Sequence, residues 1–300
     1  MTKSWMKYAA AANVLAAACA LYAADQAIIT IQSPNLFPES ITSTKDGAII
    51  IGSYGTNSIW RIPAGKNEAA KWIDAGQTKG ALLGVLADEK SGRLLVCHAG
   101  VKTFDLKTGA PKEALNIPMA NPFCNDLAVR GDGSIFVTDT NGAKVFMFAK
   151  GATSAVEIAS DPLLAGADGL AFLSDQNKLY VNTVTTSKML RLDLDKTGKA
   201  TKITELKQSR PLQGPDGMRA IDGKRLIIAE GNGRTAMGVP NGDAIEITTL
   251  KEGGMDGGTP AVTVTKGVGW TMEGKLRQRD AKNPDADKGP FRLFKVPLPK

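Results

Sequence analysis

A repeating pattern of about 44 residues constrains the fold of this chain more than any other feature of its sequence. Each unit has a short apolar segment, a polar turn, an apolar run, a second polar turn, and a segment in which apolar and polar residues alternate. The third unit reads "CNDLAVRGDGSIFVTDTNGAKVFMFAKG". Six such units occupy residues 38–299, and the fifth carries an insertion before "DAIEITTLKEGG".

The apolar runs of the repeat have the length and the composition of β-strands, being short and rich in Val, Ile, Leu and Phe. One small twisted sheet cannot bury both of its faces, whereas six sheets in a ring bury them and leave little exposed edge. The sequence therefore predicts an all-β fold, a six-bladed β-propeller with four-stranded antiparallel blades around a central channel. A two-sheet sandwich would need no repeat. We expect "AIITIQ" (27–32) to close the ring beside "FRLFKVPL" (291–298).

Composition agrees with a turn-rich β protein, since the chain has 32 Gly and 15 Pro. The net charge is +7, but Lys and Arg are scattered, and no basic cluster is flanked by aromatic residues. We interpret this charge as a solvated basic surface and expect no nucleic-acid partner.

The N-terminal residues differ in composition from the rest of the chain. Two lysines in "MTKSWMK" precede the Ala-rich run "YAAAANVLAAACALYA", and "ACA" at 18–20 fits a signal-peptide cleavage site. The run is too short and too rich in Ala to predict a transmembrane helix. We expect a signal peptide at 1–24, a single propeller domain at 25–300 and a periplasmic or secreted mature protein with no membrane span. The segment "LAAAC" at 15–19 resembles a lipoprotein signal less closely.

Two cysteines remain after such a cleavage, Cys97 and Cys124. An exported protein can oxidise them to a disulfide. Each also lies in or beside a strand-like run, where a buried free thiol is the alternative. The sequence leaves both states open.

Aligning the six units brings polar residues to one position, the start of the first strand. The aligned residues recur at steps of 42 to 48 residues, and they are Glu39, Leu83, Asn125, Asp168, Asp216 and Pro260. In a propeller the innermost strands line the channel, so equivalent positions point to one axis. Three carboxylates there repel one another unless they bind protons or a cation. Oxygen ligands without His or Cys favour Ca²⁺, then Mg²⁺ or Mn²⁺.

A second ring is predicted at the ends of the second strands, which return to the rim where the first strands begin. Its members are Ser53, His98, Asp139, Thr183 (with Asn182 beside it), Glu230 and Glu273. We expect His98, Asp139, Glu230 and Glu273 to surround a substrate, although rim hydrogen bonds explain the two glutamates equally well. His98 is the only histidine of the chain, and a single histidine is usually structural. With one His and no G-x-S-x-G motif, a Ser-His-Asp hydrolase is not indicated.

At these positions the sequence resembles the senescence marker protein (regucalcin), gluconolactonase and luciferin-regenerating enzyme family. The resemblance rests on four short motifs in order, and it covers about residues 33–299: "FPES" at Glu39, "CNDLAV..DGSIFVTD" at Asn125, "ADGLAF....KLYVN" at Asp168 and "PDGMR......LIIAE" at Asp216. It implies a six-bladed propeller with a divalent cation, usually Ca²⁺ and sometimes Zn²⁺, in the channel, and in many members lactone hydrolysis.

Carried over by motif, the resemblance implies that Glu39, Asp168 and Asp216 bind the metal. Asn125 would be a fourth ligand or hold a water or the substrate, and Asp216 would be the general base. Two departures are notable: Asp168 stands where many members have Asn, and Phe123 where sugar-lactone members have Arg. Phe123 indicates a less polar substrate ring than a sugar lactone.

These observations predict an exported, divalent-metal-dependent lactonase or esterase that acts on a small-molecule lactone or ester. The alternatives are a non-enzymatic binding or scaffold propeller with a structural central Ca²⁺, and an enzyme of the strictosidine-synthase type, which a catalytic Glu273 would favour. All three share one fold, which does not determine function.

Overall fold

The computed structural model describes residues 29–74, 81–253, 255, 258–279 and 288–299. The predicted signal peptide at 1–24 lies outside this part of the chain. Within it, no helix has both the length and the apolar character that a membrane crossing requires.

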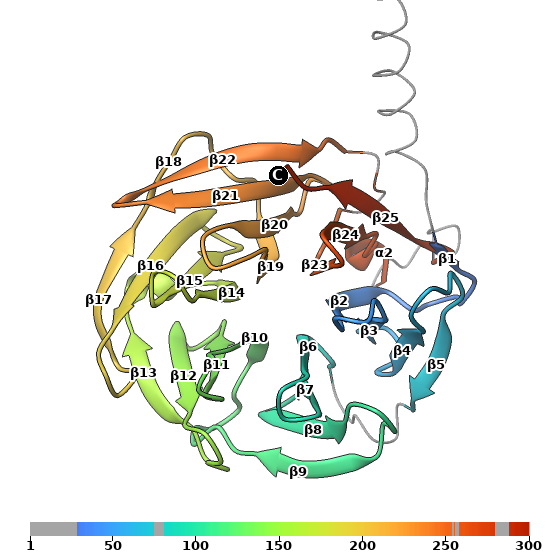
Figure 1. Cartoon of the computed structure of the whole chain (residues 1–300), viewed down its shortest axis with the longest axis horizontal. Helices are drawn as coiled ribbons and strands as arrows, with labels where there is room; N and C mark the ends of the chain where they lie inside the picture. The colour runs from blue at the N-terminus through green and yellow to red at the C-terminus, as the bar shows by residue number, and fades with distance from the viewer. Residues whose placement is uncertain (1–28, 75–80, 254, 256–257, 280–287, 300) are drawn as a thin grey trace, which may run out of the picture.

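Six sheets, each with four antiparallel strands, stand around a central axis, as the repeat predicted (Figure 1). The first strand of each blade lies innermost, and later strands lie progressively farther out. The first three blades are β2 (Pro38–Ser43), β3 (Ile49–Ser53), β4 (Ile59–Ile62) and β5 (Ala70–Ile73); β6 (Val85–Asp88), β7 (Arg93–Cys97), β8 (Val101–Asp105) and β9 (Pro111–Leu115); and β10 (Cys124–Val129), β11 (Ile135–Asp139), β12 (Lys144–Phe148) and β13 (Val156–Ser160).

The fourth blade is again a regular four-stranded sheet. It holds β14 (Ala167–Leu173), β15 (Lys178–Thr183), β16 (Lys188–Leu194) and β17 (Ala200–Glu205), and a short 3₁₀ turn, η2 (Pro162–Leu164), precedes it.

The fifth blade differs from its prediction in two respects. The residues interpreted as an insertion form its third strand, because they pair along their whole length with the next strand. A short fifth strand, β18 (Lys207–Gln208), also pairs in parallel with the outer strand β22 (Ala244–Lys251). The sheet contains β19 (Pro215–Ala220), β20 (Leu226–Glu230), β21 (Thr235–Asn241), β22 (Ala244–Lys251) and β18 (Lys207–Gln208).

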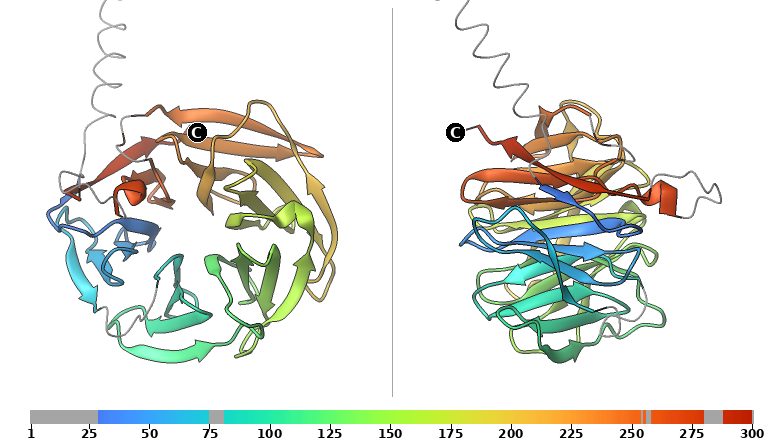
Figure 2. Two further views of the ribbon diagram at one scale, coloured as in Figure 1. Left: turned by 180° about the vertical axis from the view of Figure 1, so that it is seen from behind. Right: turned by 90° about the vertical axis from the view of Figure 1, so that its right-hand side faces the viewer.

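The sixth blade joins the two ends of the described chain. It holds β23 (Val262–Thr265), β24 (Val268–Met272) and β25 (Phe291–Pro297), and its outer strand is the N-terminal β1 (Ile29–Ile31). β1 pairs antiparallel with β25, as predicted for the closure of the ring. A short helix, α2 (Leu276–Arg279), projects from one face of the disc in the side view (Figure 2).

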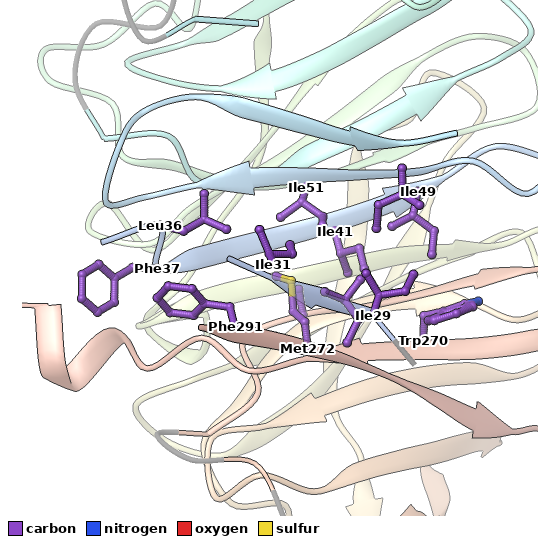
Figure 3. Packing of buried hydrophobic residues seen from close by; sticks show 13 residues of the cluster. Ile29, Ile31, Leu36, Phe37, Ile41, Ile49, Ile51, Trp270, Met272 and Phe291 are labelled. Atoms are coloured by element: carbon purple, nitrogen blue, oxygen red, sulfur yellow. The ribbon is translucent and has the colours of Figure 1, made fainter. Parts of the chain in front are cut away.

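The hydrophobic core lies mainly between neighbouring blades. At the closure, Ile29 and Ile31 pack with Phe291 and Met272 of blade six and with Ile41 of blade one (Figure 3). Each of these side chains is almost fully buried, which removes apolar area from water worth about 1.5–3 kcal/mol per side chain. The closing strand is therefore held by packing as well as by ladder hydrogen bonds.

Candidate functional site

Four of the six innermost strands begin with a β-bulge, and these are the four whose aligned residue carries a side-chain oxygen. The strand pairing shifts between Pro38 and Ser40 in blade one, and corresponding shifts separate Cys124/Leu127, Ala167/Leu170 and Pro215/Met218. In the described residues, the first strand pairs of blades two and six show no shift. A bulge places an extra residue out of the pleat and re-aims its side chain. The bulges therefore direct these residues into the channel.

The bulged residues meet around one small cavity on the axis. Glu39, Asn125, Asp168 and Asp216 all line it, together with Pro260. Of the six aligned positions only Leu83 is missing from the lining, and its neighbour Gly84 takes its place. The cavity has a volume of about 10 Å³, room for one water-sized particle. The predicted inner ring thus converges on a space of single-ion size.

Glycines allow the innermost strands to approach closely enough to form this cavity. The Gly84 amide donates to the carbonyl of Asn125 at 2.6 Å, and the Gly217 amide donates to the carbonyl of Pro260 at 2.7 Å. A Cβ atom on Gly169 would stand 2.4 Å from the carbonyl oxygen of Asp216. Glycine is therefore required beside the ring residues.

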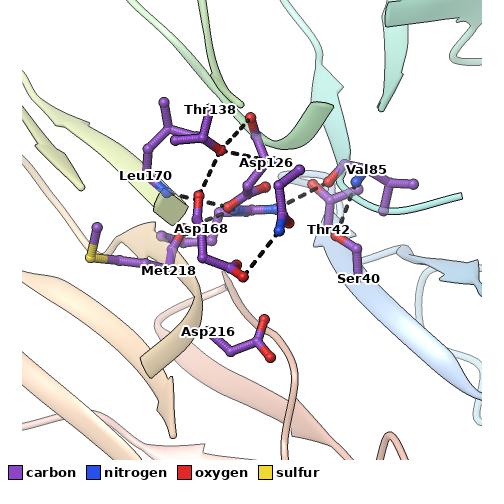
Figure 4. A network of polar contacts seen from close by, with 12 residues as sticks. Ser40, Thr42, Val85, Asp126, Thr138, Asp168, Leu170, Asp216 and Met218 are labelled. Carbon is purple, nitrogen blue, oxygen red and sulfur yellow. Dashed lines mark hydrogen bonds and ion pairs between the residues drawn. The ribbon is translucent and has the colours of Figure 1, made fainter. Parts of the chain in front are cut away.

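Two polar side chains of the second strands connect neighbouring members of the ring. Thr138 accepts a hydrogen bond from the Asp126 amide at 3.1 Å and donates to the Asp168 carbonyl at 2.7 Å (Figure 4). Asn182 repeats the arrangement one blade later, accepting from the Gly169 amide at 3.1 Å and donating to the Asp216 carbonyl at 2.6 Å. Both lie opposite a bulge and are fully buried. They hold the backbones of Asp168 and Asp216 in register.

The carboxyl groups of the ring interact directly. Asn125 Nδ2 donates to Asp168 Oδ2 at 3.0 Å and to Thr140 Oγ1 at 3.0 Å. The side chains of Asp168 and Asp216 also interact, and this interaction lowers the pKa of Asp168 and raises that of Asp216, so it favours a proton on Asp216. Glu39 Oε2 is buried and has no hydrogen-bond partner in the described structure. An orphaned carboxylate oxygen facing a void needs a proton or a cation.

Burial and mutual repulsion favour protonation of these carboxyl groups. Burial, followed by the charge of Asp126, raises the pKa of Asp168 to about 7. Burial, and then the negative charge of Asp168, raises the pKa of both Glu39 and Asp216 well above the usual carboxyl range. The charge of Arg279 opposes the shift of the Glu39 pKa. The ring has the electrostatic character of a site in which charge is compensated by protons or by a bound cation.

Asp126 and Arg219 form a buried ion pair beside the ring that the sequence reasoning missed. Arg219 Nη1 donates to Asp126 Oδ2 at 2.6 Å, and Arg219 Nη2 donates to the Val85 carbonyl at 3.2 Å. Arg219 thereby spans the channel from blade five to blades two and three. Both residues stand inside the quoted motifs, in "CND" and "PDGMR". Asp126 directly follows the aligned Asn125, and Arg219 lies three residues after the aligned Asp216, so charged residue types beside two aligned positions were the available signal.

The second predicted ring is present at the rim, but its acids bond within their own blades. Asp139 Oδ2 accepts from the Phe123 amide at 3.0 Å, and Glu230 Oε2 accepts from the Gln213 amide at 2.9 Å. Arg210 also binds Glu230, and Arg292 binds both carboxylate oxygens of Glu273. The smaller members behave alike, since Ser53 Oγ donates to the Leu36 carbonyl and Thr183 Oγ1 pairs with Thr186 Oγ1. The structure thus favours rim hydrogen bonds over substrate contacts for Asp139, Glu230 and Glu273.

The rim on the side of blades one to three carries a group of apolar side chains. Phe123 and Met119 pack with Tyr54 against the core between blades two and three. The guanidinium of Arg279 lies 3.8 Å from the centre of the Tyr54 ring. Burial, and then the nearby Lys102, lowers the pKa of His98, which favours the neutral form. Its Nε2 is buried without a hydrogen-bond partner in the described structure.

Cys97 and Cys124 form a disulfide, which resolves the alternative that the sequence left open. Their Cα atoms are 5.2 Å apart. The bond joins the end of the second strand of blade two to the start of the first strand of blade three. It therefore ties blade two directly to the residue that precedes Asn125.

The donor set fits a hard divalent cation, although the ring is not arranged for coordination as it stands. The candidates are oxygen donors only, Glu39 has an orphaned oxygen, and the cavity is of single-ion size. Among the described residues, no group of three or more His, Cys, Asp or Glu side chains is arranged to hold a metal ion.

The fold and this cavity define a class of protein: a closed six-bladed propeller with an acidic, oxygen-lined centre near one mouth of its channel. The chain belongs to the SMP-30/gluconolactonase/LRE-like family, whose model matches residues 37–253. The match includes the four oxygen-bearing members of the ring and ends before blade six.

Solved structures of similar fold include a gluconolactonase, XC5397, from Xanthomonas campestris, which is 18% identical with a TM-score of 0.65 and with 92% of this chain and 88% of that chain covered. A luciferin-regenerating enzyme is 14% identical with a TM-score of 0.69, and the match covers 92% of this chain and 94% of that chain. Regucalcin from Agrobacterium tumefaciens, a calcium-binding protein, is 16% identical with a TM-score of 0.64, covering 91% and 98%. At such identities the likeness shows the fold alone. Comparison with curated protein sequences gave no significant match.

Proposed function

We propose that this protein is a divalent-metal-dependent lactonase or esterase with its reaction centre at the oxygen-lined cavity. One observation carries the proposal: four bulges deliver Glu39, Asn125, Asp168 and Asp216 to a single void of ion size. Membership of a family that includes gluconolactonases supports hydrolysis of a cyclic ester.

Glu39, Asp168 and Asp216 would hold the cation, with the Asn125 side-chain carbonyl as a fourth donor. Ca²⁺ suits this set best, because all donors are oxygens; Mg²⁺, Mn²⁺ and Zn²⁺ are the other candidates. A bound cation supplies Lewis-acid polarisation of the ester carbonyl.

Asp216 is the residue that we assign to proton transfer. It lies at the cavity, and its backbone is fixed by Asn182 through a hydrogen bond of 2.6 Å. Burial, and then the charge of Asp168, raises its pKa, which makes it a better proton acceptor than an ordinary carboxylate. It would accept a proton from the attacking water and return it to the leaving alkoxide. The hydrogen bond from Asn125 would keep Asp168 oriented beside it.

The rim determines the class of substrate in this proposal. Phe123, Met119 and Tyr54 present an apolar wall, and no arginine stands at position 123 to bind sugar hydroxyls. We therefore propose a lactone or ester with an apolar ring or chain. His98 stands beside the disulfide at the same rim and is assigned to substrate contact as a neutral group.

We also propose that the protein is exported to an oxidising compartment. The Cys97–Cys124 disulfide supports this, because such bonds persist in periplasmic and secreted proteins and are rare in the cytosol. The N-terminal signal pattern is the sequence basis of the proposal. Fractionation of cells that express the full chain, with N-terminal sequencing of the product, tests it.

A panel of γ- and δ-alkyl lactones, sugar lactones and aryl esters tests the enzymatic proposal. Turnover should be highest for alkyl lactones, should stop with EDTA and should return with Ca²⁺. The Asp216→Asn variant should lose activity by at least about 100-fold. Full activity of this variant on every lactone cleaved by the wild type would remove Asp216 from the role of base. No turnover, combined with stabilisation by Ca²⁺, would instead identify a binding propeller with a structural ion.

A further inference from the structure

A second and larger cavity lies at the opposite mouth of the channel, where the innermost strands end. Its volume is about 330 Å³, within the range of small-molecule sites. Ser43, Asp88, Val129 and Ala220, the last residues of β2, β6, β10 and β19, all line it. We call this cavity the far mouth. It does not belong to the carboxylate ring, whose members stand at the other ends of the same strands.

Arg219 forms the floor of the far mouth and separates it from the ring. The side chain crosses the channel to Asp126 and to the Val85 carbonyl, and only 8% of the residue is exposed. Because Asp126 also lines the small cavity of the ring, the ion pair is the partition between the two spaces. The far mouth is thus a closed cup and not a passage to the reaction centre.

The walls of this cup are apolar in part. Leu86, Val129, Phe172 and Val264 line it and remain only half-buried, although they are side chains that a blade would normally cover. The neighbouring hydroxyls do not offer competing polarity, since Thr42 accepts from the Ala87 amide at 3.1 Å and Ser43 donates to the Val264 carbonyl at 3.0 Å. A group of exposed apolar side chains around one concavity is the usual mark of a ligand site.

The rim of the cup carries an excess of positive charge. Lys45 and Lys90 stand there with Glu89 and Asp88. Asp88 is paired with Arg93 at 3.4 Å, and Asp126 with Arg219. Among the described residues that line the cup, Glu89 is then the one acid left to balance the two lysines. Lys90 Nζ donates to the Gly131 carbonyl at 2.6 Å and retains two further N–H groups. The rim therefore attracts a single negative charge.

We propose that the far mouth binds a small monocarboxylate with an apolar body. The body would lie against Leu86, Val129 and Phe172, and the carboxylate would lie at the rim between Lys45 and Lys90. A body of about six to ten carbons fits a cavity of this size. This site is independent of the metal and of the proposed hydrolysis, because Arg219 and Asp126 close the channel between them.

The test is calorimetric titration of the whole mature protein with octanoate, in EDTA and separately with Ca²⁺, beside the neutral probe 1-octanol. One octanoate should bind per chain under both conditions, and octanol should bind more weakly. The double variant Lys45→Ala/Lys90→Ala should weaken octanoate binding about fivefold, the effect of two exposed ion pairs. The matched double variant Lys71→Ala/Lys207→Ala, on the outer strands β5 and β18, should leave it unchanged.

Ala220→Phe supplies the steric test, because Ala220 is exposed, lines the cavity and can be enlarged without disturbing the core. This variant should abolish binding while its melting temperature stays that of the wild type. Asp216→Asn, at the other mouth, should bind octanoate normally. The proposal is overturned if octanoate shows no saturable binding, if Ala220→Phe binds it as well as the wild type, or if Asp216→Asn loses it.

Discussion

The buried carboxyl of Asp168 should make the metal-free protein less stable as the pH rises, and the substitution Asp168→Asn should remove that effect. In the folded protein, burial and the charge of Asp126 raise the pKa of Asp168 to about 7. In the unfolded chain the group has its ordinary pKa of 3.8. Below that value both states are protonated. Between the two values only the unfolded chain ionises, so ionisation favours unfolding as the pH rises.

The magnitude follows from the distance between the two pKa values. Each pKa unit corresponds to 1.36 kcal/mol, so this one group costs the folded state about 4 kcal/mol above pH 7. About 3 kcal/mol of that loss falls between pH 5 and pH 8. The Asn side chain can keep the hydrogen bond from Asn125 through its oxygen and donate to Asp216 through its nitrogen. The metal-free variant should therefore be more stable than the wild type by about 4 kcal/mol at pH 8, and by less than half of that at pH 5.

Urea unfolding in EDTA at pH 5, 6, 7 and 8 measures how the free energy of unfolding changes with pH in the wild type and in Asp168→Asn. The control is Asp132→Asn, since hydrogen bonding to Arg130 lowers the pKa of Asp132 to about 2. That exposed group stabilises the fold above its unfolded pKa, so its removal should have the opposite sign and a smaller size. Saturating Ca²⁺ should reverse the order of wild type and Asp168→Asn at pH 8. The reasoning fails if metal-free Asp168→Asn is less stable than the wild type at pH 8, or if it keeps the slope of the wild type.

Three further perturbations test separate parts of the structure. Asn182→Ala removes the hydrogen bonds to the Gly169 amide and the Asp216 carbonyl. Calcium affinity, measured by calorimetry, should therefore fall about 10- to 100-fold. An unchanged affinity would show that Asn182 does not position Asp216. Arg219→Met removes the partner of the buried Asp126, which should lower the free energy of unfolding in urea by about 3–5 kcal/mol. Arg219→Met/Asp126→Leu should recover most of that free energy. An equal loss in both variants would refute the ion-pair explanation. The Cys97–Cys124 bond closes a loop with a sequence separation of 27, so Cys97→Ser/Cys124→Ser should lower the free energy of unfolding by roughly 3–4 kcal/mol, and a difference below about 1 kcal/mol would mean that the loop is constrained without the bond.

The fold could be predicted from the sequence because the same strand pattern occurs six times. Period and strand length together specify a ring, and the alignment of units placed Glu39, Asn125, Asp168 and Asp216 at one level, where the structure has them. The fifth unit was misread because its third strand, "TAMGVPN", contains Gly and Pro, which normally mark a turn. This strand, β21, pairs with β20 on one side and with β22 on the other, and these two pairings outweigh the local signal of Gly and Pro.

What the sequence did not reveal depends on contacts across the ring. The bulges at the four oxygen-bearing positions arise from the pairing of two strands, which no single segment specifies. Arg219 and Asp126 are 93 residues apart and meet only because Arg219 crosses the channel. The second ring shows the converse. Glu230 and Glu273 occupy the predicted level, but Arg210 and Arg292, outside the aligned motifs, bind their carboxylates.

Calcium titration of the purified, EDTA-treated protein tests the central claim most directly. If the four bulged residues form a metal centre, calorimetry at pH 7.5 should show one Ca²⁺ per chain, with release of protons from the ring carboxyls whose pKa values burial raises. Glu39→Gln/Asp216→Asn should remove the binding, whereas Glu230→Gln should retain it. Binding of Ca²⁺ that survives Glu39→Gln/Asp216→Asn, or no binding by the wild type, would contradict the account.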